Sequence, residues 1–247
     1  WAPDGNDILF SGTADDIKLV ALAVNLADRQ VRTILGSPVP VTILDVNDQG
    51  TWLIIDEDTV NGVMAHPAGS DRDIDLTWLD SCWGPTLAPD NKTLIFTNGR
   101  GSSNYTVVTR TSDRSPLVTL GEGDARGLSP DGSWMAALVA TPPGLFLYPL
   151  GTGSPRRLEQ GPIVQIQNAQ WFPDSQHVFL TGNESTGPLR CYRQAIAGGL
   201  PALIDVQGVE TFSLLTLDGK AVLGLASDLK WYLFPLAGGE PRLVPGL

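Results

Sequence analysis

Six copies of a short turn motif divide the sequence into units of nearly equal length. In its fullest form the motif is a Trp or Leu, a variable residue and Pro-Asp-Gly, and an apolar run follows it. The aspartates of the six copies are 41–44 residues apart: Asp4, Asp48, Asp90, Asp131, Asp174 and Asp218. A regular period of this length is the signature of a repeat architecture.

Each unit carries the same order of local signals. Pro presets the backbone of the turn, Asp can accept hydrogen bonds from nearby backbone N–H groups, and Gly tolerates the left-handed conformation. A β-rich run, a polar loop, a second β-rich run such as 145–148, a Gly-rich turn such as 151–153 and a short edge segment such as 241–244 follow. This order predicts four short strands per unit. Residues 17–26 have a helix-like composition, but their place in the repeat predicts the third strand of the first unit.

Four antiparallel strands repeated every 41–44 residues predict an all-β fold, a six-bladed β-propeller with four-stranded blades. One blade cannot bury both of its faces, so neighbouring blades must stack. We number the units one to six in chain order, and their predicted ranges within the single domain are 1–43, 44–84, 85–127, 128–169, 170–212 and 213–247. The inner strand of unit one would mostly precede Trp1, so the first blade is predicted to be incomplete and the chain to be a fragment of a longer protein.

The motif resembles the Pro-Asp propeller repeats of the TolB-type family, which are WD-like β-propeller repeats. The same repeat occurs in propellers beside prolyl-oligopeptidase-like enzymes and in bacterial signalling proteins. Unit two departs from it at Val46-Asn47, and unit six has Leu217 where Pro is expected. The resemblance covers essentially the whole chain and implies the propeller fold, with a periplasmic or extracytoplasmic location.

Charge and composition narrow the classes of partner. The chain has 16 Lys and Arg against 27 Asp and Glu, a net charge of −11, which argues against a nucleic-acid-binding surface. No apolar run is long enough to span a bilayer, so direct membrane insertion is not expected. Cys82 and Cys191 lack metal-ligand spacing. We interpret them as small buried residues, although the sequence leaves a disulfide open and does not settle the compartment.

The other chemistry-bearing residues do not converge on a site. The repeated aspartates sit in six equivalent turns, so closure of a ring would hold them apart. Asp71, Asp73 and Asp75 begin like a calcium loop, but Leu76 and Cys82 stand where Gly and Glu are needed, which favours the solvent face of an outer strand. His66 and His177 occupy unrelated repeat positions, which argues against a triad or a zinc centre. We therefore predict no catalytic residue, no metal site and no cofactor.

Propellers usually bind their ligands at one mouth of the central channel, on loops that a rigid scaffold carries. The repeat places on one face the linkers between units and the loops between second and third strands. Residues predicted to line the mouth are Trp83, Asp124, Arg126, Gln167, Asn168 and Glu210, with Asn98, Arg100, Asn183 and Glu184 farther out. Trp83 could equally belong to the core. A mixed polar ring of this kind suits a peptide or protein segment.

The sequence therefore favours a non-enzymatic binding module, the sensor or interaction domain of a larger bacterial signalling or envelope protein, monomeric as a domain. The alternative is an accessory propeller that gates substrate for a prolyl-oligopeptidase-like hydrolase whose catalytic domain lies outside this chain. A propeller that is itself a sugar or peptide hydrolase is disfavoured because the sequence offers no convergent acid–base pair.

Overall fold

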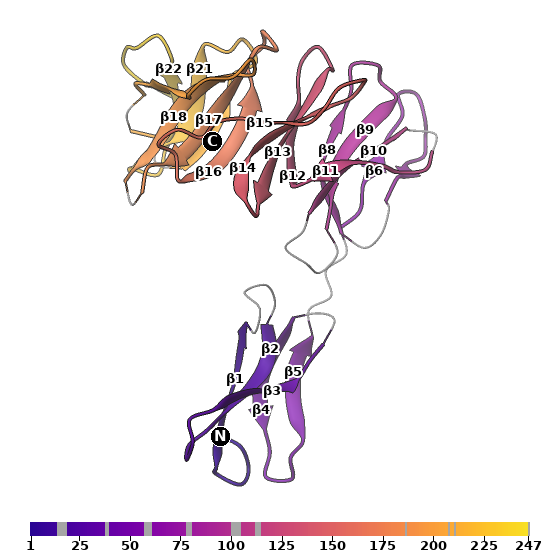
Figure 1. Ribbon diagram of the computed structural model, residues 1–247, viewed down its shortest axis with the longest axis vertical. Coiled ribbons are helices and arrows are strands. Elements are labelled where there is room, and N and C mark those ends of the chain that lie inside the picture. The colour runs from indigo at the N-terminus through magenta and orange to yellow at the C-terminus, as the bar shows by residue number, and fades with distance from the viewer. Residues whose placement is uncertain are drawn as a thin grey trace.

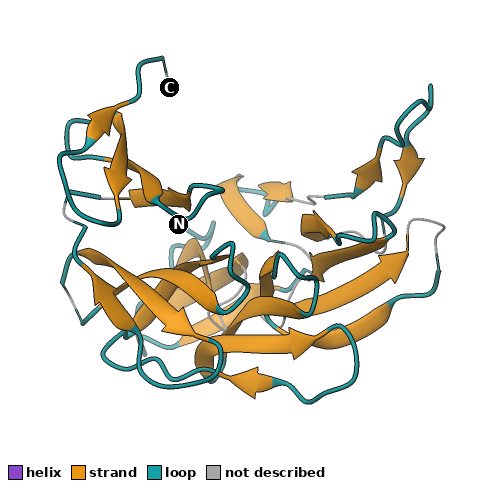
Figure 2. Cartoon of the chain, turned by 90° about the horizontal axis from the view of Figure 1, so that it is seen from above, coloured by secondary structure: helices purple, strands orange, loops and turns teal. Residues whose placement is uncertain are grey.

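The computed structural model describes residues 1–13, 19–37, 40–56, 61–77, 81–99, 105–111, 115–185, 187–206, 208–209 and 211–246. These ranges form strands and turns and contain no helix, as the repeat predicts (Figure 2). Among them, accordingly, there is no helix of the length and apolarity that crossing a membrane requires.

Four of the six units each fold into one four-stranded antiparallel sheet. Unit three contains β8 (Cys82–Leu87), β9 (Thr93–Asn98), β10 (Thr106–Thr111) and β11 (Val118–Glu122). Unit four contains β12 (Asp124–Leu128), β13 (Trp134–Ala140), β14 (Pro143–Pro149) and β15 (Arg156–Arg157). Unit five contains β16 (Gln165–Trp171), β17 (His177–Asn183), β18 (Leu189–Ala195) and β19 (Ala202–Ile204). Unit six contains β20 (Thr211–Leu215), β21 (Ala221–Leu225), β22 (Trp231–Pro235) and β23 (Arg242–Leu243). Each sheet begins a few residues before the range drawn from the motif, because its inner strand leads into the turn.

Units one and two differ from this pattern. The described part of unit one forms a three-stranded sheet, β1 (Asp7–Thr13), β2 (Leu19–Asn25) and β3 (Val31–Leu35), in which β1 is an edge strand. Unit two is divided into two separate pairs: β4 (Val41–Val46) with β5 (Trp52–Asp56), and β6 (Met64–Ala65) with β7 (Ile74–Asp75). Figure 1 shows β1–β5 as one body and the sheets of units three to six side by side in another. The described residues of unit two therefore do not form the predicted four-stranded blade, and the number of blades and the closure of the ring stay predictions.

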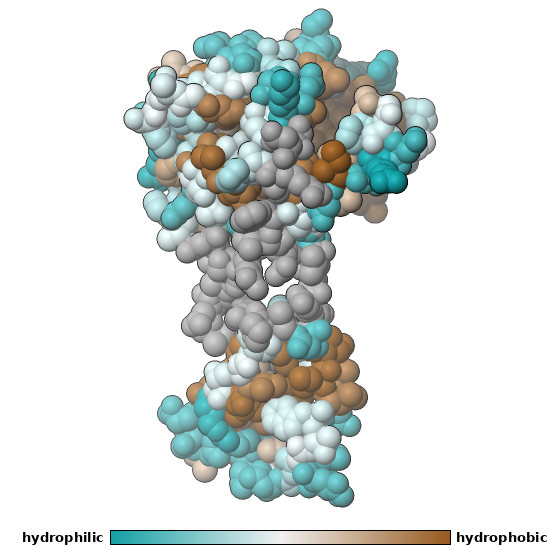
Figure 3. Space-filling model, turned by 90° about the vertical axis from the view of Figure 1, so that its right-hand side faces the viewer, coloured by the Kyte–Doolittle hydropathy of each residue, from teal (hydrophilic) through white to brown (hydrophobic). Residues whose placement is uncertain are grey.

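The division of unit two leaves apolar residues of β4 and β5 uncovered. Leu44, Leu53 and Ile55 are 54%, 59% and 43% exposed, and the face drawn in Figure 3 shows a hydrophobic surface on the body that contains β1–β5. The other pair of strands packs on unit three, where Val63 and Leu76 join the buried cluster around Phe96. The two pairs thus have different neighbours: β4 contacts β1 and β2 and buries Val41, while β6 and β7 pack on unit three.

Sheets three to six stack face to face through a buried cluster at each junction. Ile95 and Met135 belong to the cluster between units three and four, Leu147 and Leu180 to the one between units four and five, and Phe179 to the one between units five and six. Because both faces of a second strand are covered, its burial is nearly continuous rather than alternating, as in β17. The fourth strands are exposed edges, and β15 consists of two arginines, which discourage edge-to-edge association.

Two predictions about single residues can be compared with this packing. The indole of Trp171 donates to the carbonyl of Gly127 in the preceding unit at 2.8 Å, which confirms that it packs between units. Trp1 stands at the same motif position but is 73% exposed, so the predicted packing between units is wrong for this residue. Cys82 and Cys191 are not joined in a disulfide and each is 1% exposed, and burial raises the pKa of Cys191 to about 11.

The turn aspartates stabilise their own turns, as the sequence predicts. Five of them accept hydrogen bonds from backbone N–H groups two or three residues ahead: Asp4, Asp90, Asp131, Asp174 and Asp218. In unit two the cap is instead Asn47, whose Oδ1 accepts from the backbone of Gln49 and Thr51 at 3.0 and 2.8 Å. The turn of unit two is one residue shorter, so the amide at the first turn position replaces the carboxylate of Asp48.

Hydrogen bonds within the turns, from hydroxyl and backbone N–H groups, lower the pKa values of four turn carboxyls. Hydroxyl donors are the main cause in three turns: Thr93 to Asp90, Ser129 to Asp131 and Thr216 to Asp218. Burial raises the pKa of Asp174, but the bonds from Gln176 and His177 outweigh it and the pKa is lowered. All four turns are therefore built to hold an ionised carboxylate.

Candidate functional site

Three consecutive inner strands present polar residues at one end of their sheets. Trp83 lies on β8, Asp124 and Arg126 on β12, and Gln167 and Asn168 on β16. Trp83, Asp124 and Gln167 each lie seven residues before their turn aspartate, so they are equivalent in the repeat. The inner strands of all three sheets carry a bulge close to these positions. A bulge re-aims side chains and frees a backbone N–H, which suits a strand end that builds a site.

Asp124 is the centre of this region. Its Oδ1 accepts hydrogen bonds from the Trp83 indole at 3.1 Å and from the Thr97 hydroxyl at 3.0 Å. Its Oδ2 is 2.8 Å from Nη2 of Arg126. The carboxylate therefore ties unit three to unit four and orients both the indole and the guanidinium. Trp83, which the sequence left open between core and axis, is half-buried and faces this cluster.

Thr97 donates a hydrogen bond to Asp124 in this cluster, and it was not identified from the sequence. It is fully buried on β9, and its Oγ1 accepts from the backbone N–H of Ala125 at 2.8 Å while donating to Asp124. Ser11, seven residues after its own turn aspartate as Thr97 is, accepts from the backbone of Ile43 at 2.7 Å. The signal in the sequence was a hydroxyl residue inside an otherwise apolar strand.

Arg126 borders a cavity of about 330 Å³ that lies mainly between units four and five, with Tyr105 reaching it from unit three. The walls combine polar and apolar side chains, among them Tyr105, Asp124, Gln165, Leu138 and Val164. One nitrogen of the guanidinium is held by Asp124, but Nε is buried and has no hydrogen-bond partner among the described residues. Tyr105 packs edge-on against Trp83, with ring centroids 4.8 Å apart. The cavity thus combines a partly exposed guanidinium with aromatic and apolar surface.

Gln167 and Asn168 lie on the next sheet and do not line this cavity. Nε2 of Gln167 donates to Oδ1 of Asn183 at 2.6 Å, so two residues predicted near the mouth do meet. The hydroxyl of Tyr192 donates to Glu184 at 2.7 Å, and burial, helped by this bond, raises the pKa of Tyr192 to about 12. Oδ1 of Asn168 accepts from the backbone of Ala169.

The structure therefore brings together Trp83, Asp124 and Arg126, while Gln167 lies on the inner strand of the next sheet and bonds to Asn183. Glu210 and Arg100 lie outside the described residues, so their predicted positions are not compared. Tyr105 and Gln165 are additions that the sequence did not single out: Tyr105 directly precedes β10, and Gln165 is the first residue of β16.

No metal-binding cluster of His, Cys, Asp or Glu is present in the part of the chain that the structure describes. His66 pairs with Asp73 at 2.8 Å and His177 pairs with its own turn Asp174 at 2.7 Å. Each histidine is thus engaged locally, in a different unit. Asp124 uses its oxygens on three donors, so its role in this geometry is to orient its neighbours.

Comparison with known proteins places the fold. No family model matches the chain, and no curated protein matches its sequence. Among solved structures, TolB from Acinetobacter baumannii has 17% identity and a TM-score of 0.57, over 96% of this chain and 64% of that one. A putative TolB from Agrobacterium tumefaciens has 14% identity and a TM-score of 0.60, over 87% of this chain and 83% of that one. The chain therefore has a TolB-like β-propeller fold.

Enzymes share this fold as well. Oligogalacturonate lyase from Vibrio parahaemolyticus has 12% identity and a TM-score of 0.56, over 98% of this chain and 75% of that one. A puromycin-hydrolysing peptidase from Mycobacterium tuberculosis has 15% identity and a TM-score of 0.53, over 96% of this chain but 43% of that one. The chain spans about two thirds of the A. baumannii TolB and less than half of the peptidase. At these identities the likeness concerns the fold.

Proposed function

We propose that this chain is a six-unit TolB-like propeller module that binds a peptide or protein segment at the mouth formed by Trp83, Asp124, Arg126 and Tyr105. The observation that carries the proposal is the Arg126 guanidinium, 32% exposed and oriented by Asp124, in the wall of a cavity of about 330 Å³. Its N–H groups that Asp124 leaves free can donate to an incoming acceptor group.

The chemistry of the mouth suits a peptide backbone better than an anion. Asp124 already neutralises the charge of Arg126, so a carbonyl oxygen matches the remaining N–H without an added charge. Val164 is 64% exposed at the rim, and Leu138 and Ile166 line the wall, which accommodates an apolar side chain next to that carbonyl. The excess of acidic residues makes nucleic acid an unsuitable partner.

Selection from a displayed library of random dodecapeptides tests the proposal. Peptides retained by the immobilised chain would be measured by fluorescence polarisation against the wild type and Arg126→Ala. Arg242→Ala on the exposed edge strand β23 is the matched control, since it removes the same side chain far from the mouth. We expect Arg126→Ala to weaken binding about tenfold and Arg242→Ala to leave it unchanged. Selected peptides that bind both variants equally would move the site away from the mouth.

A second candidate is an accessory propeller that gates access to a hydrolase domain. The specific observation is that two peptidases match almost the whole of this chain with less than half of their own length, 43% and 48%. In that case the partner at the mouth is a substrate peptide in transit. The peptides would then bind weakly with no dependence on sequence, whereas a recognition module would enrich a defined motif.

A further inference from the structure

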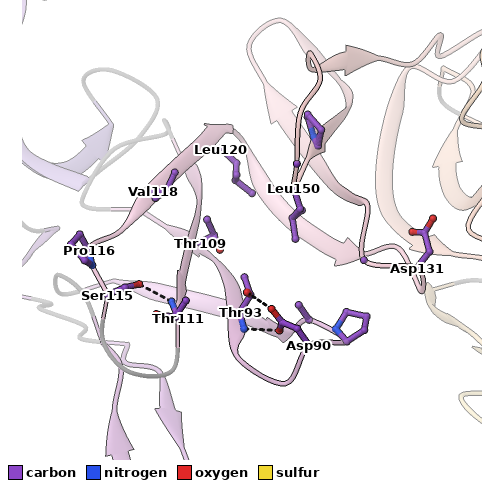
Figure 4. Close-up of a pocket in the computed structure, with 15 residues that line it drawn as sticks. Asp90, Thr93, Thr109, Thr111, Ser115, Pro116, Val118, Leu120, Asp131 and Leu150 are labelled. Carbon is purple, nitrogen blue, oxygen red and sulfur yellow. Dashed lines mark hydrogen bonds between the residues drawn. The ribbon is translucent and has the colours of Figure 1, made fainter.

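A second and larger hollow lies between units three and four, at the end of the sheets that carries the Pro-Asp turns. Its volume is about 680 Å³, and it is lined by hydroxyl, proline and aliphatic residues. Figure 4 shows Thr93 hydrogen-bonded to Asp90 and Thr109 beside them on the unit-three side, with Leu150 coming from the other sheet. We call this hollow the turn-side groove. It is separate from the mouth, which lies at the opposite end of β9.

The registers of the sheets show why the turn-side groove exists. The residue five positions after each turn aspartate lies on the second strand of its unit. In four units an arginine on the third or the fourth strand is in register with that residue across the sheet. These arginines are Arg32, Arg156, Arg193 and Arg242. The corresponding residues of unit three are Thr109 and Val118, both of which line the groove.

Three of the four arginines cover the start of their own second strand. Arg32 forms an ion pair with Asp7 at 2.6 Å, and the guanidinium of Arg156 lies 4.7 Å from the Trp134 ring. Arg193 does both, because its Nη2 donates to Oδ2 of the turn Asp174 at 3.0 Å and its guanidinium lies 4.9 Å from the Phe172 ring. In these units the arginine occupies the space that unit three leaves open.

Asp90 in unit three is the counterpart of Asp174 in unit five. Oδ2 of Asp90 accepts from the Thr93 hydroxyl at 2.6 Å, just as Oδ2 of Asp174 accepts from His177 at 2.7 Å. In unit five the same oxygen accepts a second bond from Arg193, whereas unit three has Thr109 in the place of that arginine. We propose that the turn-side groove binds an arginine side chain presented by a partner peptide or protein, with its guanidinium directed to Asp90.

Charge and shape both suit this occupant. The charged residues among those lining the groove are Asp90 and Asp131, both acidic, in a chain of net charge −11. Leu120, Val118 and Leu150 offer aliphatic surface for the methylene stem of an arginine, and the planar guanidinium matches a carboxylate. The partner thus restores in unit three the arginine that the chain itself provides elsewhere.

This inference is tested by titrating the isotope-labelled full chain with short peptides and measuring the NMR chemical shifts of its backbone amides. The probes are acetyl-Ala-Ala-Arg-Ala-Ala-amide and its citrulline counterpart, which has nearly the same shape without the charge. We expect saturable shifts at Thr93, Thr109 and Thr111 and about tenfold tighter binding of the arginine peptide. Equal binding of the two peptides, no saturation up to about 10 mM, or shifts centred on Asp124 and Arg126 would each overturn the inference.

Two substitutions test whether the arginine peptide binds in the turn-side groove. Asp90→Asn keeps an oxygen to cap the turn, as Asn47 does in unit two, but removes the charge, so it should weaken the arginine peptide about tenfold. Val118→Arg supplies the arginine in cis and should abolish binding, whereas Val118→Leu should leave it intact. Full binding to either Asp90→Asn or Val118→Arg contradicts the inference. Arg126→Ala should bind the probe normally, so failure at the mouth and failure at the groove are distinguishable.

Discussion

Removal of the Thr97 hydroxyl tests whether the Asp124 cluster is a structural joint between units three and four. Thr97 has no exposed surface, and its Oγ1 is bonded on both sides, to the backbone N–H of Ala125 and to Asp124. Valine has nearly the same shape, so Thr97→Val removes these two bonds without opening a cavity. Ala125 is only 9% exposed, and its N–H would be left in the interior without an acceptor.

The cost follows from that unpaired group. Leaving one buried donor unsatisfied costs about 1–3 kcal/mol. The Asp124 carboxylate also loses the bond from the Thr97 hydroxyl, so we expect a cost in the upper part of this range. For a chain of this size each kcal/mol lowers Tm by about 2–4 °C. We therefore expect the urea midpoint and Tm to fall while the dependence of the unfolding free energy on urea keeps its slope.

Thr119→Val is the matched control, because Thr119 is exposed on β11 of the same sheet and water can replace its hydroxyl. Its unfolding free energy should stay within about 0.5 kcal/mol of the wild type. If Thr97→Val were as stable as Thr119→Val, the Asp124 cluster would not hold the two units together and the reasoning would be refuted.

Three further predictions concern the packing and the turns. Leu180→Ala, in the buried cluster between units four and five, should lower the free energy of chemical unfolding by about 2–5 kcal/mol. Leu217→Ala, fully exposed in a turn, should leave it almost unchanged, and equal losses would contradict sheet stacking. Gly219→Ala should lower Tm and Gly151→Ala should not, because Gly219 has φ +68° and a Cβ there would lie 2.7 Å from Pro173, while Gly151 has open space around it. Acid should destabilise the chain: the turn carboxyls of units three to six have lowered pKa values, so their contribution is complete above about pH 4 and is lost as the pH falls through their folded pKa values. Unfolding midpoints that stay constant between about pH 5 and pH 2 would refute this last prediction.

The repeat allowed most of the fold to be predicted, because its information is local. Pro-Asp-Gly turns and β-rich runs are short-range signals, so the strands of units three to six follow directly from them. The repeat also overrode composition correctly at Leu19–Asn25, which is strand β2 despite its helix-like residues. Burial on both faces explains this outcome, since the strand is apolar for packing rather than for helix formation.

The division of unit two was not predictable from the motif. β6 and β7 have two residues each, and their pairing depends on packing against unit three rather than on a turn signal. The departure at Val46-Asn47 marked the unit as irregular, but it concerned the turn, where Asn47 proved to be an adequate cap. Long-range packing of short strands is not encoded in any local pattern.

The candidate site was predictable only where its residues occupy positions that the repeat fixes. Trp83 and Asp124 share a repeat position on neighbouring inner strands, so the motif made both of them candidates for the mouth, while it left Trp83 open between the core and the axis. Tyr105 and the arginine register across the sheets could not be foreseen, because both depend on loop lengths between strands, which differ from unit to unit. The registers of β10 and β11 had to be observed before Thr109 and Val118 could be compared with the arginines of other units.

The mouth and the turn-side groove use opposite ends of the same strand, and this arrangement predicts that they act independently. Thr93 begins β9 and lines the groove, while Thr97, four residues later, supports Asp124. At the rise of a β-strand these two positions are about 13 Å apart. Val118, on the fourth strand of the same sheet, is level with the buried Ile95 and two strands away from it, which puts it about 12 Å from Thr97. Substitutions at that separation normally add to within about 0.5 kcal/mol. The unfolding free energy of Thr97→Val combined with Val118→Arg should therefore equal the sum of the single changes, and a larger deviation would show that β9 couples the two ends.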